Sequence, residues 1–152
     1  MRSVVSIVAI LALSAGILPA GASSPDDKNI DQQSIDLLEA RANQAAPREQ
    51  CFLYAELLHQ MTEFSLREYA AGDVEKASGL LKRIQTLAHK IHLSVGDDNK
   101  RLKNAEILLR HTTFRLNEML HNSAFEDRPL VQETLAQVSQ AQTEAMLQVF
   151  RK

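Results

Sequence analysis

The sequence predicts an all-α protein: an antiparallel four-helix bundle built from two helical hairpins, preceded by a short extra helix. Three observations predict this fold class. Ala, Leu, Gln, Glu, Lys and Arg dominate the 152 residues, and all of them favour helices. Apolar residues recur at spacings of three and four along four long segments. Glycine and proline are scarce and lie mostly where those segments end, and no convincing strand pattern is present.

The first 22 residues have the pattern of an export signal. Arg2 precedes an apolar run over residues 4–18, and Ala20 and Ala22 fit a small-x-small cleavage site. We therefore expect cleavage between Ala22 and Ser23, and a periplasmic or secreted protein. The alternative is an uncleaved membrane anchor, but a spanning helix needs about 20 apolar residues. This run is shorter and is interrupted by two serines and a glycine, so no stable membrane span is expected after cleavage.

Residues 23–28 are polar and predict a disordered new N-terminus, and residues 29–152 predict one helical domain. Asn29 or Asp31 can cap a short helix that reaches about residue 45. Its expected apolar side is Ile30, Leu37, Leu38 and Ala42. Pro47 then fits the first turn of a new helix.

The first predicted hairpin consists of helices over residues 47–71 and 74–95. Gly72 can take the positive φ that ends a helix, and Asp73 can cap the next one, so the connection is very short and the two helices are antiparallel neighbours. The apolar stripe of the first helix is Leu57, Leu58, Met61 and Phe64. The stripe of the second is Val74, Ala77, Leu81, Ile84, Ala88, Ile91 and Val95.

The second predicted hairpin consists of helices over residues 100–122 and from about 128 to the end of the sequence. Asp127 or Arg128 is the expected cap of the last helix, with Pro129 in its first turn. The inner stripe of the third helix is Leu102, Ala105, Leu109, Thr112, Leu116 and Met119. The stripe of the fourth is Val131, Leu135, Val138, Ala145 and Val149.

The two hairpins resemble one another. Residues 55–68 match residues 105–118 at a shift of 50, and seven of the fourteen pairs are identical. Shared apolar spacing accounts for matched leucines in any two amphipathic helices, but it does not account for matched Glu56, Thr62 and Glu68. The last helix matches the second one more loosely, at a shift of 54. The pattern therefore favours an internal duplication.

The wider pattern around two stretches resembles that of small exported bacterial helical proteins with no assigned activity. The stretches are Cys51–His59 (CFLYAELLH) and Lys100–Glu106 (KRLKNAE). The resemblance covers most of the chain that follows the export signal. It implies an exported helical fold and no particular chemistry.

Charge and cysteine content limit the possible functions. The formal net charge is −2, which argues against a dedicated nucleic-acid binder, because such proteins usually show a strongly basic face. Cys51 is the only cysteine, so an internal disulfide is excluded. We expect it to act as a buried small hydrophobe; an intermolecular disulfide and a reactive thiol are the alternatives.

Met61 and His111 are the candidate cofactor ligands. They are equivalent in the repeat and should lie at similar heights, and Met/His ligation of haem is known in helical cytochromes. The alternative is that Met61 fills core space and His111 is a hydrogen-bonded imidazole. The chain has no Cys-x-x-Cys-His attachment motif.

His59, His89 and His92 are the candidate metal ligands. His89 and His92 lie three residues apart on one predicted helix, which suits a weak surface site or simply a solvated face. His59 ends the string Glu56-x-x-His59, and a similar string begins at Glu118, as in di-iron bundles. The two strings should differ in height by roughly 16 Å at 1.5 Å per residue, which argues against a di-iron site.

No nucleophile–base motif, phosphate-binding glycine loop or dense zinc-ligand cluster is present in the sequence. The sequence therefore favours a non-catalytic exported protein without a cofactor, which acts by protein–protein contact in the cell envelope, with a homodimer as one form. A haem- or metal-carrying bundle is the alternative. An enzyme whose functional residues are dispersed along the chain is a third hypothesis.

Overall fold

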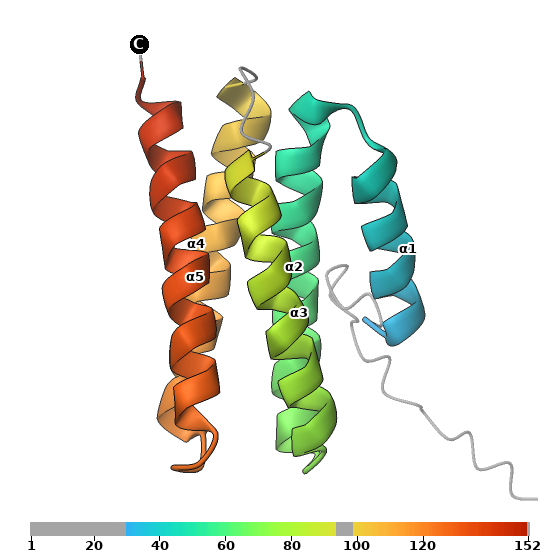
Figure 1. The fold of residues 1–152 in the computed structure, drawn as a ribbon, viewed down its shortest axis with the longest axis vertical. Coiled ribbons are helices and arrows are strands. Elements are labelled where there is room, and N and C mark those ends of the chain that lie inside the picture. Colours follow the sequence, from blue (N-terminus) through green and yellow to red (C-terminus); the bar gives the residue numbers. More distant parts are fainter. Residues whose placement is uncertain (1–29, 94–98, 152) are drawn as a thin grey trace, which may run out of the picture.

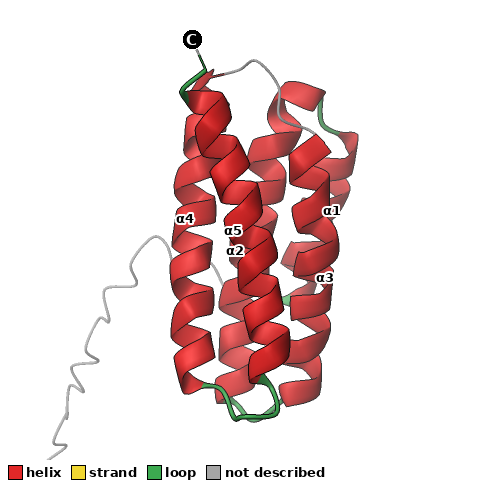
Figure 2. Cartoon of the chain, turned by 60° about the vertical axis from the view of Figure 1, so that its left-hand side comes forward, coloured by secondary structure: helices red, strands yellow, loops and turns green. Residues whose placement is uncertain are grey.

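The computed structural model describes residues 30–93 and 99–151 (Figure 1). These ranges contain five α-helices and no strand (Figure 2), which confirms the all-α prediction. The helices are α1 (Gln32–Gln44), α2 (Pro47–Ala70), α3 (Val74–Leu93), α4 (Asn99–Asn122) and α5 (Arg128–Val149). The predicted export signal at 1–22 and the predicted disordered stretch at 23–28 lie outside the described residues. Within the described ranges, no helix combines the length and apolar character needed to cross a membrane.

Helices α2 to α5 lie side by side, and successive helices point in opposite directions (Figure 1). Helix α2 packs on α3 and α4, and α5 packs on the same two helices. As a result α2 runs parallel to its neighbour α4, and α3 runs parallel to its neighbour α5. Helix α1 packs on the outer side of α2. Among the described helices, α2 therefore has three neighbours and α4 has two.

The start of α1 is fixed by a reciprocal cap. Asp31 Oδ1 accepts a hydrogen bond from the Ser34 backbone N–H at 2.7 Å, and Ser34 Oγ accepts one from the Asp31 N–H at 3.0 Å. These bonds satisfy two amide donors that an uncapped helix leaves open. Asp31 is thus the cap of α1, and Asn29, the other predicted cap, lies outside the described residues. Helix α2 begins at Pro47, as the sequence predicts.

The turn between α2 and α3 follows the predicted chemistry. Gly72 has a φ of +88°, a conformation that residues with a Cβ rarely adopt. Asp73 Oδ1 then accepts a hydrogen bond from the Lys76 N–H at 3.0 Å and caps α3. The very short connection makes α2 and α3 antiparallel neighbours.

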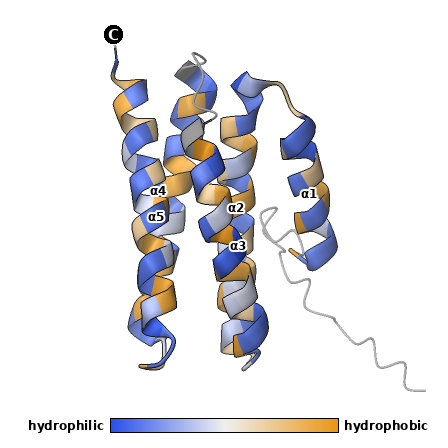
Figure 3. Cartoon of the chain, in the orientation of Figure 1, coloured by the Kyte–Doolittle hydropathy of each residue, from blue (hydrophilic) through white to orange (hydrophobic). Residues whose placement is uncertain are grey.

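The core lies between α2, α3, α4 and α5. Hydrophobic and hydrophilic residues alternate along each helix, as expected for helices with one buried side (Figure 3). The predicted stripe of α4 is buried over its whole length: Leu102, Ala105, Leu109, Thr112, Leu116 and Met119. The predicted stripe of α3 is buried from its second member onward: Ala77, Leu81, Ile84, Ala88 and Ile91.

Two residues predicted to lie in the apolar stripes are exposed. Leu37 of α1 is 65% exposed, and Ile35 is fully buried instead. Helix α1 buries only a narrow stripe, Ile35, Leu38 and Ala42, whereas its Asp36 and Glu39 reach Arg83 of α3 across the surface. Val74 is 37% exposed because it is the first residue of α3, beside the turn. Val95 lies outside the described residues.

The α4–α5 loop is tied to the end of α2 by one tyrosine. Asp127 precedes α5 as predicted, but its side chain makes no capping bond. Its Oδ2 instead accepts a hydrogen bond from the Tyr69 hydroxyl at 2.9 Å, and that hydroxyl accepts one from the Ala124 N–H at 2.8 Å. Tyr69 thereby joins the first hairpin to the second.

Candidate functional site

A group of interacting polar side chains lies where α2 packs on α4. We call it the α2–α4 polar cluster. Its members are His59 and Glu63 of α2 and His111, Thr112, Arg115 and Glu118 of α4. The two helices are parallel here, so each residue of α2 lies beside a residue of α4 about fifty positions later.

Arg115 is held by two carboxylates. Its Nε donates to Glu63 Oε1 at 2.6 Å and its Nη2 donates to Glu63 Oε2 at 3.0 Å, a bidentate pair between the helices. Its Nη1 also donates to Glu118 Oε2. The bonds to Glu63 and then to Glu118 raise the pKa of Arg115 against the opposing effect of burial. Arg115 therefore stays charged and fixes the register of α2 on α4.

His59 is half-buried beside this ion pair. The Thr112 hydroxyl donates to the Leu108 carbonyl at 2.8 Å and lies 3.4 Å from His59 Nδ1. Because the hydroxyl hydrogen is already used, we assign Nδ1 as the donor, which leaves the lone pair on Nε2. Burial lowers the pKa of His59; Glu63 opposes this, whereas His111 and Arg115 lower it further. The imidazole is therefore neutral at pH 7.

His59 also meets His111 edge to face, with ring centroids 6.4 Å apart and planes at 86°. The structure thus brings together one predicted metal candidate and one predicted haem candidate. Neutral imidazoles are good ligands for zinc, copper and nickel. The described residues contain no group of three or more His, Cys, Asp or Glu side chains placed to hold a metal ion.

The other predicted ligands lie apart from this pair. Met61 is fully buried in the core, whereas its repeat partner His111 is exposed on α4. His89 is exposed on α3 and borders a shallow hollow against α5. The side chain of His92 lies outside the described residues. Cys51 is buried as predicted, and burial raises its pKa to about 11.

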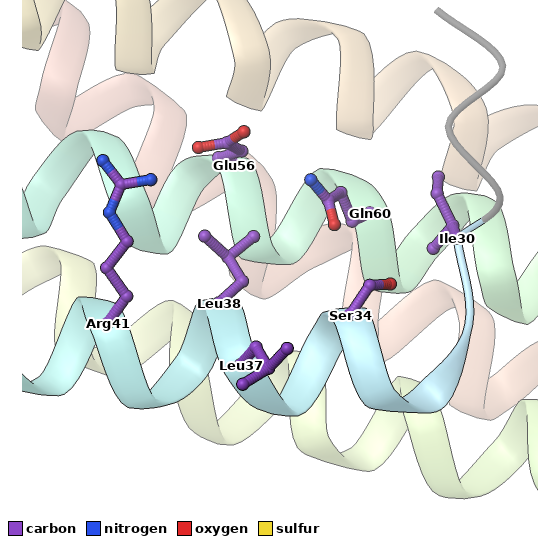
Figure 4. A pocket seen from close by; sticks show the side chains of 7 residues that line it. All are labelled: Ile30, Ser34, Leu37, Leu38, Arg41, Glu56 and Gln60. Atoms are coloured by element: carbon purple, nitrogen blue, oxygen red, sulfur yellow. The ribbon is translucent and has the colours of Figure 1, made fainter.

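A groove lies between α1 and α2, and the sequence analysis did not predict it. Figure 4 shows Leu38 and Arg41 projecting from α1 toward α2, which contributes Glu56 and Gln60 to the lining of the groove. Ile30, Ser34 and Leu37 complete its lining. The groove is open and combines apolar walls with two charges. Its residues come from two helices and follow no short sequence motif.

Large apolar side chains stand exposed on α4 and at the end of α5. Phe114 of α4 is 63% exposed and Ile107 is 37% exposed. Leu147 is 59% exposed and Phe150 is 76% exposed near the C-terminal end of α5. Beside Ile107, a hollow opens between α2 and α4, lined by Phe52, Glu56, Asn104, Ile107 and Leu108. The sequence identified Phe114 only as a repeat match to Phe64, which is buried.

In comparisons with known proteins, no family model, no curated protein and no solved structure matches this chain.

Proposed function

We propose that this chain is an exported, non-catalytic helical protein that acts by protein–protein contact in the cell envelope. The exposed apolar residues on α4 and α5 carry the proposal, because the chain already buries a long apolar core and leaves these side chains outside it. Single exposed apolar residues are normal on a monomer, but Ile107 and Phe114 lie two turns apart on one side of α4, and this grouping supports a contact surface. The export pattern of residues 1–22 supports an address in the periplasm or outside the cell.

We also propose that α2–α5 form an antiparallel four-helix bundle that arose by duplication of one hairpin. The environments of matched residues support this proposal. Thr62 and Thr112 are both fully buried, and both Ala55 and Ala105 are fully buried as well. Other pairs differ: Phe64 is 3% exposed and Phe114 is 63% exposed. Phe64 lies beneath the side chains of Arg67 and of Lys76 from α3, whose charged groups are 5.0 and 4.6 Å from its ring centroid.

Two measurements on intact cells test the proposed function. The mass of the protein recovered from the envelope should correspond to a chain that begins at Ser23, because cleavage follows Ala22. Chemical cross-linking in the same cells should give adducts of the chain with protein. A chain that keeps its first residues and stays in the cytoplasm would contradict the export. A correctly exported chain that gives no protein adducts would contradict the contact function.

The second candidate function is a haem or metal carrier. The edge-to-face pair of His59 and His111 favours it, since the two imidazoles come from different helices. Absorbance and metal analysis of protein purified from its native compartment would test it. The carrier predicts a Soret band or a stoichiometric metal that is lost in His59→Gln. A clean spectrum with no stoichiometric metal would rule it out.

A further inference from the structure

We infer that the chain forms a two-fold symmetric dimer through the outer face of α4. This face consists of Lys103, Ile107, Arg110, Phe114 and Glu118, and we call it the α4 outer face. The inference rests on the proposed function, because it names a second copy of the chain as the partner and α4 as the surface that binds it.

The α4 outer face lies opposite the buried stripe of the same helix. Its members recur at spacings of three and four, so they line one side of α4 over about four turns. Ile107 and Phe114 are two turns apart, roughly 10 Å along the axis at 1.5 Å per residue. Lys103 and Glu118 stand at the two ends of the face. An apolar pair is thus flanked by opposite charges.

This pattern is complementary to itself when two copies of α4 run antiparallel. A two-fold axis that passes between Arg110 and His111 places Ile107 of each copy beside Phe114 of the other. The same axis places Lys103 of each copy beside Glu118 of the other. In this one register the apolar residues contact each other and the opposite charges pair, and each contact occurs once on either side of the axis. A shift of one turn in either direction separates both kinds of pair.

An open hollow adjoins Ile107. The hollow between α2 and α4 measures about 290 Å³ and is mainly apolar, with Phe52 and Leu108 in its wall. In the proposed register, Phe114 of the second copy arrives at the mouth of this hollow. A phenyl ring that is 63% exposed in the single chain thereby gains a place to be buried. The same contact repeats across the axis, so the assembly closes at two chains.

The positive charge of Arg110, which lies near the two-fold axis, is balanced within its own chain. Arg110 would approach its own copy there, but Arg110 Nη2 donates to Glu106 Oε2 at 3.0 Å within the same helix. Glu118 is 41% exposed at its side chain although it accepts a bond from Arg115, so it remains accessible to Lys103 of the second copy.

Sedimentation velocity of the exported full chain tests the dimer, with two phenylalanine variants that differ only in position. Phe114→Asp should weaken the dimer by at least about 100-fold, because it places two carboxylates in two apolar contacts. Phe125→Asp is the matched control, since Phe125 is 82% exposed in the α4–α5 loop and off this face. It should leave the dimer unchanged. Circular dichroism should show that both variants are folded.

A charge exchange tests the register itself. Lys103→Glu alone and Glu118→Lys alone should each weaken the dimer about 10-fold or more, because each creates two like-charge contacts. An equal mixture of the two variants should regain the wild-type dimer, since both contacts in the mixed dimer pair opposite charges. Failure of the mixture to associate better than either variant would overturn the proposed register.

The failures of the two proposals are distinguishable. A wild-type chain that is monomeric at about 100 μM, or a dimer that Phe114→Asp leaves intact, overturns the dimer inference. Protein adducts in cells would then still support the proposed function. If Phe114→Asp breaks the dimer but the chain keeps its first residues and stays in the cytoplasm, the interface stands and the exported role in the proposed function is overturned.

Discussion

Replacing Leu109 by alanine should destabilise the protein strongly, whereas the same replacement at Leu147 should not. Leu109 is fully buried in the inner stripe of α4, and Leu147 is 59% exposed on α5. Each change removes the same three carbon atoms from a helix. The two variants therefore differ only in what surrounds the side chain.

The magnitude follows from burial. At about 0.8 kcal/mol for each buried methylene, the three carbons of Leu109 contribute roughly 2.4 kcal/mol. The unfilled cavity adds to this, and measured losses for buried leucines run from about 2 to 5 kcal/mol. We expect about 3 kcal/mol for Leu109→Ala, which is a large share of a typical stability of about 5–15 kcal/mol. For Leu147→Ala we expect a change of about 0.5 kcal/mol or less.

Urea denaturation followed by circular dichroism measures both changes. The midpoint should fall for Leu109→Ala with an unchanged slope, and it should stay within error of wild type for Leu147→Ala. Equal midpoints for the two variants would show that α4 does not bury its inner stripe, and the proposed packing of the two hairpins would then be wrong.

Three further predictions concern single groups. Burial lowers the pKa of His59 in the folded chain, so the unfolded chain binds the proton first as the pH falls. The free energy of unfolding, measured by urea titration, should decrease as the pH drops through about 6.5. His59→Gln should remove that part of the pH dependence. If the variant keeps the wild-type dependence of unfolding free energy on pH, the buried neutral imidazole is contradicted. Burial raises the pKa of Cys51 from 9.0 to about 11. A thiol reagent at pH 8 should therefore modify the folded chain at least about 100-fold more slowly than the urea-unfolded chain. Equal rates for the two chains would show that the thiol is accessible in the folded protein. Gly72→Ala should destabilise the protein by about 1 kcal/mol because of the positive φ at that position. Gly79 lies inside α3 with open space around it, so Gly79→Ala should stabilise the protein by about 0.5–1 kcal/mol. Melting temperatures that shift in the same direction for both variants would refute this contrast.

The helices could be predicted from the sequence because their signals are local. Pro47, Gly72 and Asp73 mark helix ends by their own backbone chemistry, and α3 and α4 carry apolar residues at helical spacing. Prediction failed where burial depends on a neighbour. Leu37 has the same local pattern as Leu38, but only one side of α1 meets α2.

The candidate site was harder to predict because rotation about the helix axis is not encoded locally. The repeat predicted similar heights for Met61 and His111, because it paired these two residues. The structure places His111 beside His59, two residues earlier on α2. The side-chain contacts between the two helices join residues 52 or 53 positions apart, as in Glu63–Arg115 and His59–Thr112, whereas the shift of the repeat is 50.

Photo-cross-linking from position 114 in living cells tests the central claim most directly. A photoreactive phenylalanine analogue at position 114 should give an adduct of twice the mass of the exported chain, and the same analogue at position 125 should give none. Adducts of that mass from position 125 alone, or no protein adduct from position 114 in a correctly exported chain, would contradict contact through the α4 outer face.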